Sequence, residues 1–179
     1  MCDERRFELG KLAGMRAFFI AGLLLLAIGL PACTESPSSP DGVEPLTLVR
    51  LRSEPYSFAF NSGLTEPQRL VIRDAAAWEQ VWNAIYRHHA SPPARPAIDF
   101  QREMVIVAAL GERPTGGFSI LVETATETAA GVTIGIRSVS PGNRCAVTLA
   151  ITQPVDIARV TRRNGIVTFA ETPQVIDCN

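Results

Sequence analysis

The sequence has few of the side chains on which enzymes rely for covalent or metal chemistry. Its 179 residues include two histidines, His88 and His89, and a single lysine, Lys11, which precedes the signal cleavage point predicted below. Without lysine, the exported chain could form neither a Schiff base nor a P-loop. Adjacent residues on a helix point about 100° apart, so His88 and His89 do not converge on one metal ion. The pair is typical of a solvated helix C-terminus.

Other catalytic patterns are also missing. The sequence contains neither the Gly-x-Ser-x-Gly nucleophile turn nor the His-Glu-x-x-His zinc motif. Four carboxylates could in principle pair as acid and base, although nothing in their spacing favours this over surface placement: Glu79, Asp99, Glu103 and Glu112. We therefore predict a protein with no catalytic residues, metal site or cofactor. The formal net charge of −1 lacks the basic excess typical of nucleic-acid-binding proteins.

The N-terminal region has the pattern of an export signal. An almost unbroken apolar run at 18–30 is too short for a comfortable membrane span and fits a secretory signal. It ends in Leu-Pro-Ala-Cys at 30–33, which resembles a bacterial lipobox. That resemblance implies cleavage before Cys33 and acylation of this cysteine. A simple signal peptide with a chance cysteine is the alternative.

The chain is expected to divide into three parts. We predict a signal peptide at 1–32, with Met15 as an alternative start to Met1. A lipidated Cys33 and a flexible Pro- and Ser-rich tether would occupy 33–45. One β-rich domain would occupy 46–179. Thr34 stands where aspartate would signal inner-membrane retention in the enterobacterial sorting pattern, which indicates a cell-envelope protein anchored in the outer membrane.

Two more cysteines lie in the part of the chain that would be exported, Cys145 and Cys178. An exported protein meets an oxidising compartment, where disulfides persist. We predict that the two cysteines pair and staple the C-terminal tail to the strand near Cys145. Two separate thiols are the alternative.

The domain has the pattern of an α+β, β-rich fold, an antiparallel sheet or sandwich with one main amphipathic helix packed on it. Short segments with Gly, Pro and Asn turns between them predict strands at 46–51, 68–73, 104–110, 118–124, 132–137, 146–152, 155–160 and 166–169. The continuous apolar run at 104–110 indicates a strand buried on both faces. Gln153-Pro154 suggests a bulge or an edge, and Arg163-Asn164-Gly165 suggests a hairpin turn.

One helix is predicted after the second strand. Asp74 suits the N-cap position, and the prolines at 92 and 93 would end the helix near His89. One apolar face is formed by residues at i, i+3, i+4 and i+7, namely Trp78, Val81, Trp82 and Ile85. We expect both tryptophans in the core rather than stacked on a ligand.

The loop between the strands expected at 104–110 and 118–124 is the candidate binding site. Its sequence at 111–120, Gly-Glu-Arg-Pro-Thr-Gly-Gly-Phe-Ser-Ile, combines two charges, a proline and two adjacent glycines. Proline and glycine favour one defined turn shape, and shaped polar loops on strands often carry function. The predicted partner contacts are Glu112, Arg113, Pro114, Thr115, Gly116 and Gly117. A purely structural turn, with Phe118 in the core, is the alternative.

Several motifs spread over roughly 70–169 together resemble one family. They are Leu-Val-Ile-Arg-Asp at 70–74, both tryptophans, Ile-Asp-Phe at 98–100, Met-Val-Ile-Val at 104–107, the loop at 111–120 and Thr-Gln-Pro at 152–154. The combination resembles the C-terminal domain family of the protease complex subunit PrcB, and Arg-Pro-Thr-Gly-Gly-aromatic-Ser-Ile is its specific part. The family usually has tyrosine where Phe118 stands. Its named member is a lipoprotein that associates with and stabilises a subtilisin-like surface protease.

The resemblance implies a binding role. We expect a membrane-tethered, non-catalytic accessory subunit that associates with another exported protein, for which a protease is one candidate. The alternative is an inhibitor whose loop at 111–120 enters a protease cleft. That alternative stems from a distant similarity to the Asn-Pro-Thr-Thr-Gly-Tyr loop of chagasin-type cysteine-protease inhibitors, which also lies on a β-sandwich.

Overall fold

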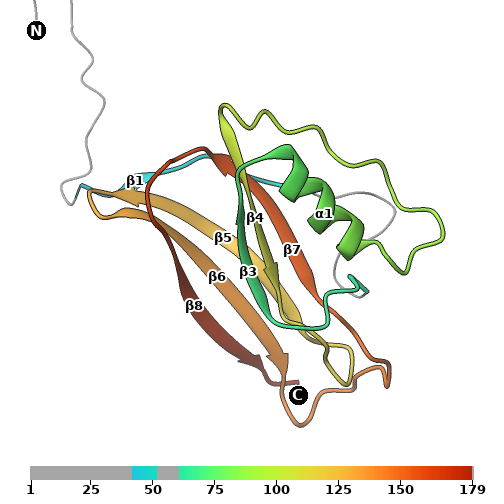
Figure 1. Cartoon of the computed structure of the whole chain (residues 1–179). Coiled ribbons are helices and arrows are strands. Elements are labelled where there is room, and N and C mark those ends of the chain that lie inside the picture. Colours follow the sequence, from blue (N-terminus) through green and yellow to red (C-terminus); the bar gives the residue numbers. More distant parts are fainter. Residues whose placement is uncertain (1–41, 52–60, 179) are drawn as a thin grey trace, which may run out of the picture. The chain divides into compact units, whose positions relative to one another are not determined.

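A computed structural model describes residues 42–51 and 61–178, all within the unit Pro37–Asn179. The predicted signal peptide and Cys33 lie outside the described residues. The elements, in chain order, are β1 (Glu44–Pro45), β2 (Leu48–Arg50), β3 (Gln68–Ile72), α1 (Ala75–Ile85), β4 (Glu103–Ala109), β5 (Ser119–Thr128), β6 (Gly131–Pro141), β7 (Val155–Thr161) and β8 (Val167–Ile176). Figure 1 shows their arrangement.

The strands form two four-stranded sheets, and this confirms the predicted β-rich α+β class. Sheet A has the order β1-β5-β6-β8, and sheet B has the order β2-β7-β4-β3. All pairs are antiparallel except β6 and β8, which run parallel over ten positions. The predicted antiparallel sandwich is therefore confirmed except at this one pair. The preceding strand, β7, belongs to sheet B, so the chain crosses to sheet A beside the start of β6, where the Val132 amide donates to the Ile166 carbonyl at 2.9 Å. From there β8 can only run in the same direction as β6.

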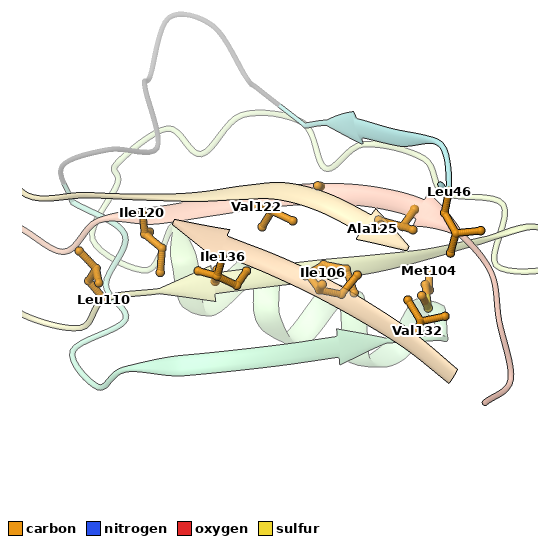
Figure 2. Close-up of a cluster of buried hydrophobic side chains, with 13 residues drawn as sticks. Leu46, Met104, Ile106, Leu110, Ile120, Val122, Ala125, Val132 and Ile136 are labelled. Atoms are coloured by element: carbon orange, nitrogen blue, oxygen red, sulfur yellow. The ribbon is translucent and has the colours of Figure 1, made fainter. Parts of the chain in front are cut away.

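Sheet B is the middle of three layers, and β4 shows why. Residues 104–109 are all completely buried, as the apolar run predicted. Successive side chains of a strand point to opposite faces. Met104 and Ile106 therefore pack toward sheet A (Figure 2), whereas Val105 and Val107 pack toward α1. Each fully buried side chain of this size contributes about 1.5–3 kcal/mol to folding.

The helix α1 forms where the sequence predicted it and covers the outer face of sheet B. The Asp74 side chain accepts a hydrogen bond from the amide of Ala77 at 2.8 Å, which confirms the N-cap. Trp78 and Trp82 are buried, and their indole nitrogens donate to the carbonyls of Pro96 and Pro93. The proline-rich segment thus satisfies the two polar groups that burial of the tryptophans would otherwise leave unpaired. The helix ends at Ile85, one turn before the predicted end near His89.

Three predicted elements differ in the structure. The strand expected at 46–51 is shortened to β2, Leu48–Arg50, because buried Leu46 lies where the chain passes from β1 in sheet A to β2 in sheet B. The segment 146–152 forms no strand and contributes only an isolated bridge at Thr152. Arg163-Asn164-Gly165 is not a hairpin turn, because β7 and β8 belong to different sheets. In all three places a local β-strand or turn signal was present, but the strand pairing was decided by distant parts of the chain.

The outer edge of sheet A is formed by β8, and a proline protects it. The Ile166 carbonyl accepts a hydrogen bond from the amide of Val132 in β6, and the Ile176 carbonyl accepts one from the amide of Gly142, which directly follows β6. Because backbone direction alternates along a strand, even-numbered residues of β8 direct their backbone groups to β6 and odd-numbered residues direct them to the open edge. Pro173 is odd-numbered, so it removes an amide donor from the open edge without weakening the sheet.

Candidate functional site

The loop at 111–118 joins β4 in sheet B to β5 in sheet A, so it closes one end of the sandwich. We call this the loop end, formed by residues 61–65, 111–118 and 141–154. The described chain begins beside the other end, because β1 pairs with Thr126 and Glu127 near the end of β5. The ten residues of β5 separate the two ends by about 30 Å, at about 3.3 Å per residue. In Figure 1 the β1 end and the loops that precede β5 and follow β6 lie on opposite sides.

Backbone hydrogen bonds to two other segments hold the loop. The Glu112 amide donates to the Thr65 carbonyl at 2.9 Å. Arg113 and Thr152 exchange two hydrogen bonds, of 2.8 and 2.9 Å, in an isolated antiparallel bridge. The Gly116 amide donates to the Thr148 carbonyl at 2.9 Å. The loop therefore has the single defined shape that its proline and glycines predicted.

Two glycines are required by close approach. At Gly111, φ is +74° and an added Cβ would lie 2.8 Å from the Thr65 carbonyl oxygen. At Gly116, an added Cβ would lie 2.3 Å from the Thr148 hydroxyl oxygen. A side chain at position 111 would push the loop away from segment 61–65, and one at position 116 would force the Thr148 hydroxyl to move.

Arg113 turns back into the loop. Its Nη2 donates to the Leu110 carbonyl at 2.8 Å, and its guanidinium carbon lies 5.8 Å from the centroid of the Phe118 ring. Its Nε is buried and has no hydrogen-bond partner among the described residues. Phe118 is half-buried and packs against the core between the sheets. Arg113 and Phe118 thus form a cation–π pair that packs the loop against the core between the sheets.

The six residues predicted to contact a partner differ in exposure. Glu112, Pro114 and Gly117 are exposed, Arg113 and Thr115 are half-buried, and Gly116 is buried. The Thr115 hydroxyl donates to the Gly116 carbonyl, and the Thr115 carbonyl accepts from the Thr152 hydroxyl. Contact between the loop and a partner remains a prediction, and its exposed part is Glu112, Pro114 and Gly117.

Gln153 connects the loop to the segment before β3. Its side chain is buried, its Oε1 accepts from the Gly63 amide at 3.0 Å, and its Nε2 donates to the Glu112 carboxylate at 3.3 Å. The neighbouring Pro154 carbonyl accepts from the Leu110 amide at 2.9 Å. The Gln153-Pro154 pair noticed in the sequence therefore fixes the base of the loop.

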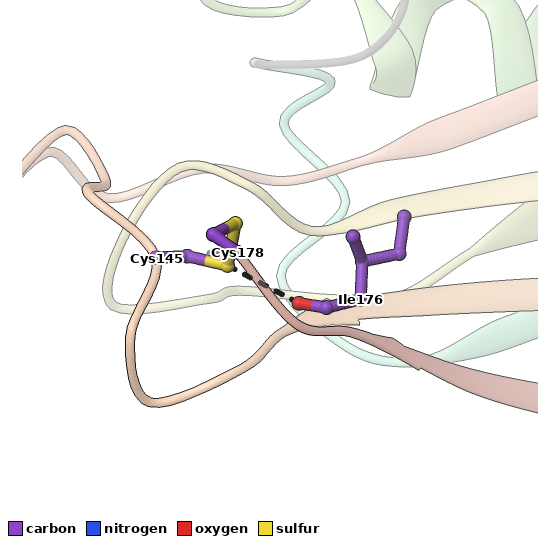
Figure 3. Close-up of a disulfide and its surroundings, with 3 residues drawn as sticks. All are labelled: Cys145, Ile176 and Cys178. Atoms are coloured by element: carbon purple, nitrogen blue, oxygen red, sulfur yellow. Dashed lines mark hydrogen bonds between the residues drawn. A yellow bond between two sulfur atoms is a disulfide. The ribbon is translucent and has the colours of Figure 1, made fainter.

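The segment 141–152 forms the rest of the loop end, and sequence reasoning missed its importance. Cys145 and Cys178 form the predicted disulfide, with 4.8 Å between their Cα atoms (Figure 3). The sulfur of Cys145 also lies 3.1 Å from the Ile176 carbonyl oxygen. The disulfide joins this segment to the end of β8. Leu149 and Ile151 on the segment are 92% and 62% exposed. No signal in the sequence distinguishes this apolar segment from the strand that was predicted at 146–152.

The residues considered for catalysis have partners of their own. Three of the carboxylates face arginines, in the pairs Glu79–Arg95, Asp99–Arg102 and Glu103–Arg159. The His89 ring contacts the Asn61 carbonyl oxygen at 3.1 Å, and the His88 ring accepts from the Arg87 side chain.

Within 42–51 and 61–178, no group of three or more His, Cys, Asp or Glu residues could hold a metal ion. The helices of this same part of the chain include none that is long and apolar enough to cross a membrane.

The comparisons with known proteins give one match. The family described as PrcB C-terminal matches residues 104–161. The matched region includes β4, the loop, β5, β6, Gln153-Pro154 and β7, so the resemblance noted in the sequence is confirmed there. It does not include the tryptophans of α1 or the Asp99-Phe100 pair, which the resemblance had also used. No curated protein and no solved structure matches the chain.

Proposed function

We propose that this chain is an exported, lipid-anchored binding subunit that uses its loop end to associate with another exported protein. The observation that carries the proposal is the rigid loop end itself. Three separate segments of the chain are tied together there by backbone hydrogen bonds and by the Gln153 side chain, and a disulfide joins one of these segments to the end of β8. Such a surface loses little conformational entropy when a partner binds.

The position of the loop end suits a tethered protein. The predicted anchor, Cys33, precedes the first described residue, Gly42, by nine positions. The chain joins the domain at the end that lies about 30 Å from the loop end, as estimated above from the rise of a strand. A flexible tether attached at this end would leave the loop end free to reach other proteins of the envelope. The similarity of residues 104–161 to the PrcB C-terminal family supports a protease as one class of partner.

The inhibitor hypothesis receives less support from the geometry. A loop that enters a protease cleft has to present several consecutive residues. Here the backbone of Glu112, Arg113 and Gly116 is paired with other segments, and Arg113 folds over Phe118. We therefore favour an accessory role, in which the chain binds a protein without blocking its active site.

The anchor is tested by metabolic labelling with a fatty acid, followed by membrane fractionation. The wild-type chain should incorporate the label and sediment with membranes, and Cys33→Ala should do neither. If Cys33→Ala is still labelled, the lipidation site is not Cys33.

The binding role is tested by purifying the tagged full chain from native membranes after photo-crosslinking with a probe at position 114. Photochemistry is needed because Lys11 is the only lysine, so amine-reactive reagents would miss the exported chain. An exported protein should be recovered, and recovery of none would refute the role. If the recovered partner is a protease, its peptide hydrolysis should persist when the complex forms; loss of hydrolysis would instead support inhibition.

A further inference from the structure

Asn164 and Gly165 lie on the linker that crosses from β7 in sheet B to β8 in sheet A (Figure 1). They form the one Asn-Gly pair in the sequence, and the hairpin turn predicted for them is not what they form. Both residues are exposed and lie outside the helix and the strands. Glycine has no Cβ, so the backbone nitrogen of Gly165 can approach the side chain of the preceding asparagine with little steric hindrance.

The backbone of Gly165 is free to react. Among residues 42–51 and 61–178, none accepts a hydrogen bond from the Gly165 amide. The space around the residue is also open, because a Cβ added there would find its nearest neighbour, the Gly131 Cα, at 4.0 Å. The amide proton is therefore accessible to bases of the solvent, and no hydrogen bond has to break before the nitrogen moves toward Asn164.

The side-chain amide of Asn164 is held and polarised by an arginine. The Arg162 Nε donates to the Asn164 Oδ1 at 3.3 Å. The Nη1 of the same guanidinium donates to the carbonyls of Arg73 and Phe100, which keeps the cation beside Asn164. When a nucleophile attacks an amide carbon, negative charge develops on the amide oxygen, and a fixed cationic donor at that oxygen stabilises the transition state.

We propose that Asn164 is a self-modification site, at which the Gly165 nitrogen attacks the Asn164 side chain and converts asparagine into aspartate or isoaspartate. A solvent base removes the Gly165 amide proton, the nitrogen bonds to the Asn164 Cγ, and the side-chain nitrogen takes a proton from water and leaves as ammonia. Water then opens the resulting succinimide ring. Cleavage of the bond to Cγ gives aspartate, and cleavage of the bond to the main-chain carbonyl carbon gives isoaspartate. The net reaction consumes one water and releases one ammonia, and it is independent of the proposed binding role.

The two products would affect the fold differently. Arg73 holds the linker on both sides of Asn164, because its Nε donates to the Arg163 carbonyl at 3.3 Å and its Nη2 donates to the Gly165 carbonyl at 3.1 Å. Isoaspartate inserts the Cβ into the main chain between these two carbonyls, so Arg73 could not bind both in the same geometry. Aspartate leaves the main chain unchanged and gives Arg162 an anionic partner. Isoaspartate should therefore loosen the crossing to β8, and aspartate should not.

The test follows the purified full chain in detergent during incubation in a mildly alkaline buffer at physiological temperature. After reduction, a glutamate-specific protease releases the peptide 128–171, which carries both Asn143 and Asn164. Asn143 is a matched internal control, because it is also exposed but precedes Arg144 instead of glycine. Mass spectrometry locates the gain of about one mass unit, and electron-transfer fragmentation distinguishes isoaspartate from aspartate. Asn164 should convert at least tenfold faster than Asn143; equal rates would overturn the proposal.

Variants separate the roles of the two neighbours. Gly165→Ala should slow conversion of Asn164 at least fivefold, and the open space at Gly165 accepts the added methyl group. Arg162→Gln should slow it at least threefold, whereas Arg163→Gln, which removes a neighbouring charge that pairs with Glu127, should change it less than twofold. Thermal unfolding midpoints report whether each variant is folded. An unchanged rate in Gly165→Ala would overturn the proposal, and equal rates in Arg162→Gln and Arg163→Gln would overturn the part assigned to Arg162.

The effect on the fold is measured on the aged protein itself. Ion-exchange chromatography separates the modified chain, and its unfolding midpoint is compared with that of Asn164→Asp. The isoaspartate form should unfold at a lower temperature than Asn164→Asp, which should resemble the unmodified chain. Equal midpoints of all three would contradict the loosening expected from the lengthened main chain.

Discussion

Asp156 on β7 and Arg50 on β2, which are neighbouring strands of sheet B, form an ion pair, and both side chains also bind the backbone of Val122 in sheet A. The Asp156 Oδ2 atom lies 2.9 Å from the Arg50 Nε and also accepts from the Val122 amide of β5 at 2.8 Å. The Arg50 Nη2 donates to the Val122 carbonyl at 2.8 Å. On the side of β5 away from β6, β1 pairs with Thr126 and Glu127. At Val122, the backbone amide and carbonyl are instead bound by the Asp156 and Arg50 side chains from sheet B.

We predict that Asp156→Ala destabilises the protein by about 2–4 kcal/mol. The Val122 amide would lose its acceptor at a fully buried residue, which costs about 1–3 kcal/mol. Breaking a fully buried ion pair costs about 3–5 kcal/mol. The Arg50 side chain is 25% exposed and the Asp156 side chain only 8%, so water would compensate part of the lost charge interaction. Asp156→Asn keeps an acceptor for Val122 and should cost less, about 1–2 kcal/mol.

The assay is equilibrium unfolding in urea, followed by the fluorescence of the buried Trp78 and Trp82. The control is Glu171→Ala, because the exposed Arg69–Glu171 pair also joins the two sheets. An exposed pair of this kind contributes about 0–1 kcal/mol. The reasoning is refuted if Asp156→Ala costs no more than Glu171→Ala, or if Asp156→Asn is as damaging as Asp156→Ala.

Two further predictions concern the disulfide and the open edge. Replacing Cys145 and Cys178 together by serine should cost about 3–4 kcal/mol in urea unfolding, because the disulfide closes a loop with a sequence separation of 33; a loss below about 1 kcal/mol would contradict this. Pro173→Thr restores an amide donor on the open edge of β8 and should raise self-association in light scattering, whereas Gln174→Thr, whose backbone faces β6, should not. Equal behaviour of these two variants would show that Pro173 does not protect the edge.

Part of the fold could be predicted because the responsible signals are local. The Asp74 N-cap and the spacing of Trp78 and Trp82 identified α1 within one turn of its true end. The uninterrupted apolar run at 104–110 identified a strand buried on both faces. The predictions failed where the structure of a segment depends on which distant strand it pairs with. Segment 146–152 has the composition of a strand, yet it pairs with the loop only at single residues.

In the candidate site too, the features set by local sequence could be predicted and those set by distant residues could not. Proline and glycine at 114, 116 and 117 showed that the loop has a defined shape, because the backbone angles of these residues are restricted or freed locally. Neither the inward turn of Arg113 nor the exposure of Leu149 could be predicted, since each depends on residues that fold against it from elsewhere in the chain.

The sequence by itself predicted the β-rich class, the helix that follows β3, the shaped loop at 111–120 and the pairing of Cys145 with Cys178, because composition, short-range spacing and the small number of cysteines point to these. Only the tertiary structure decided that β8 runs parallel to β6, that Arg50 and Asp156 meet across 106 positions, and that Leu149 and Ile151 are exposed. These features depend on which strands become neighbours when the two sheets pack, and that choice minimises the free energy of the whole chain rather than of any one segment.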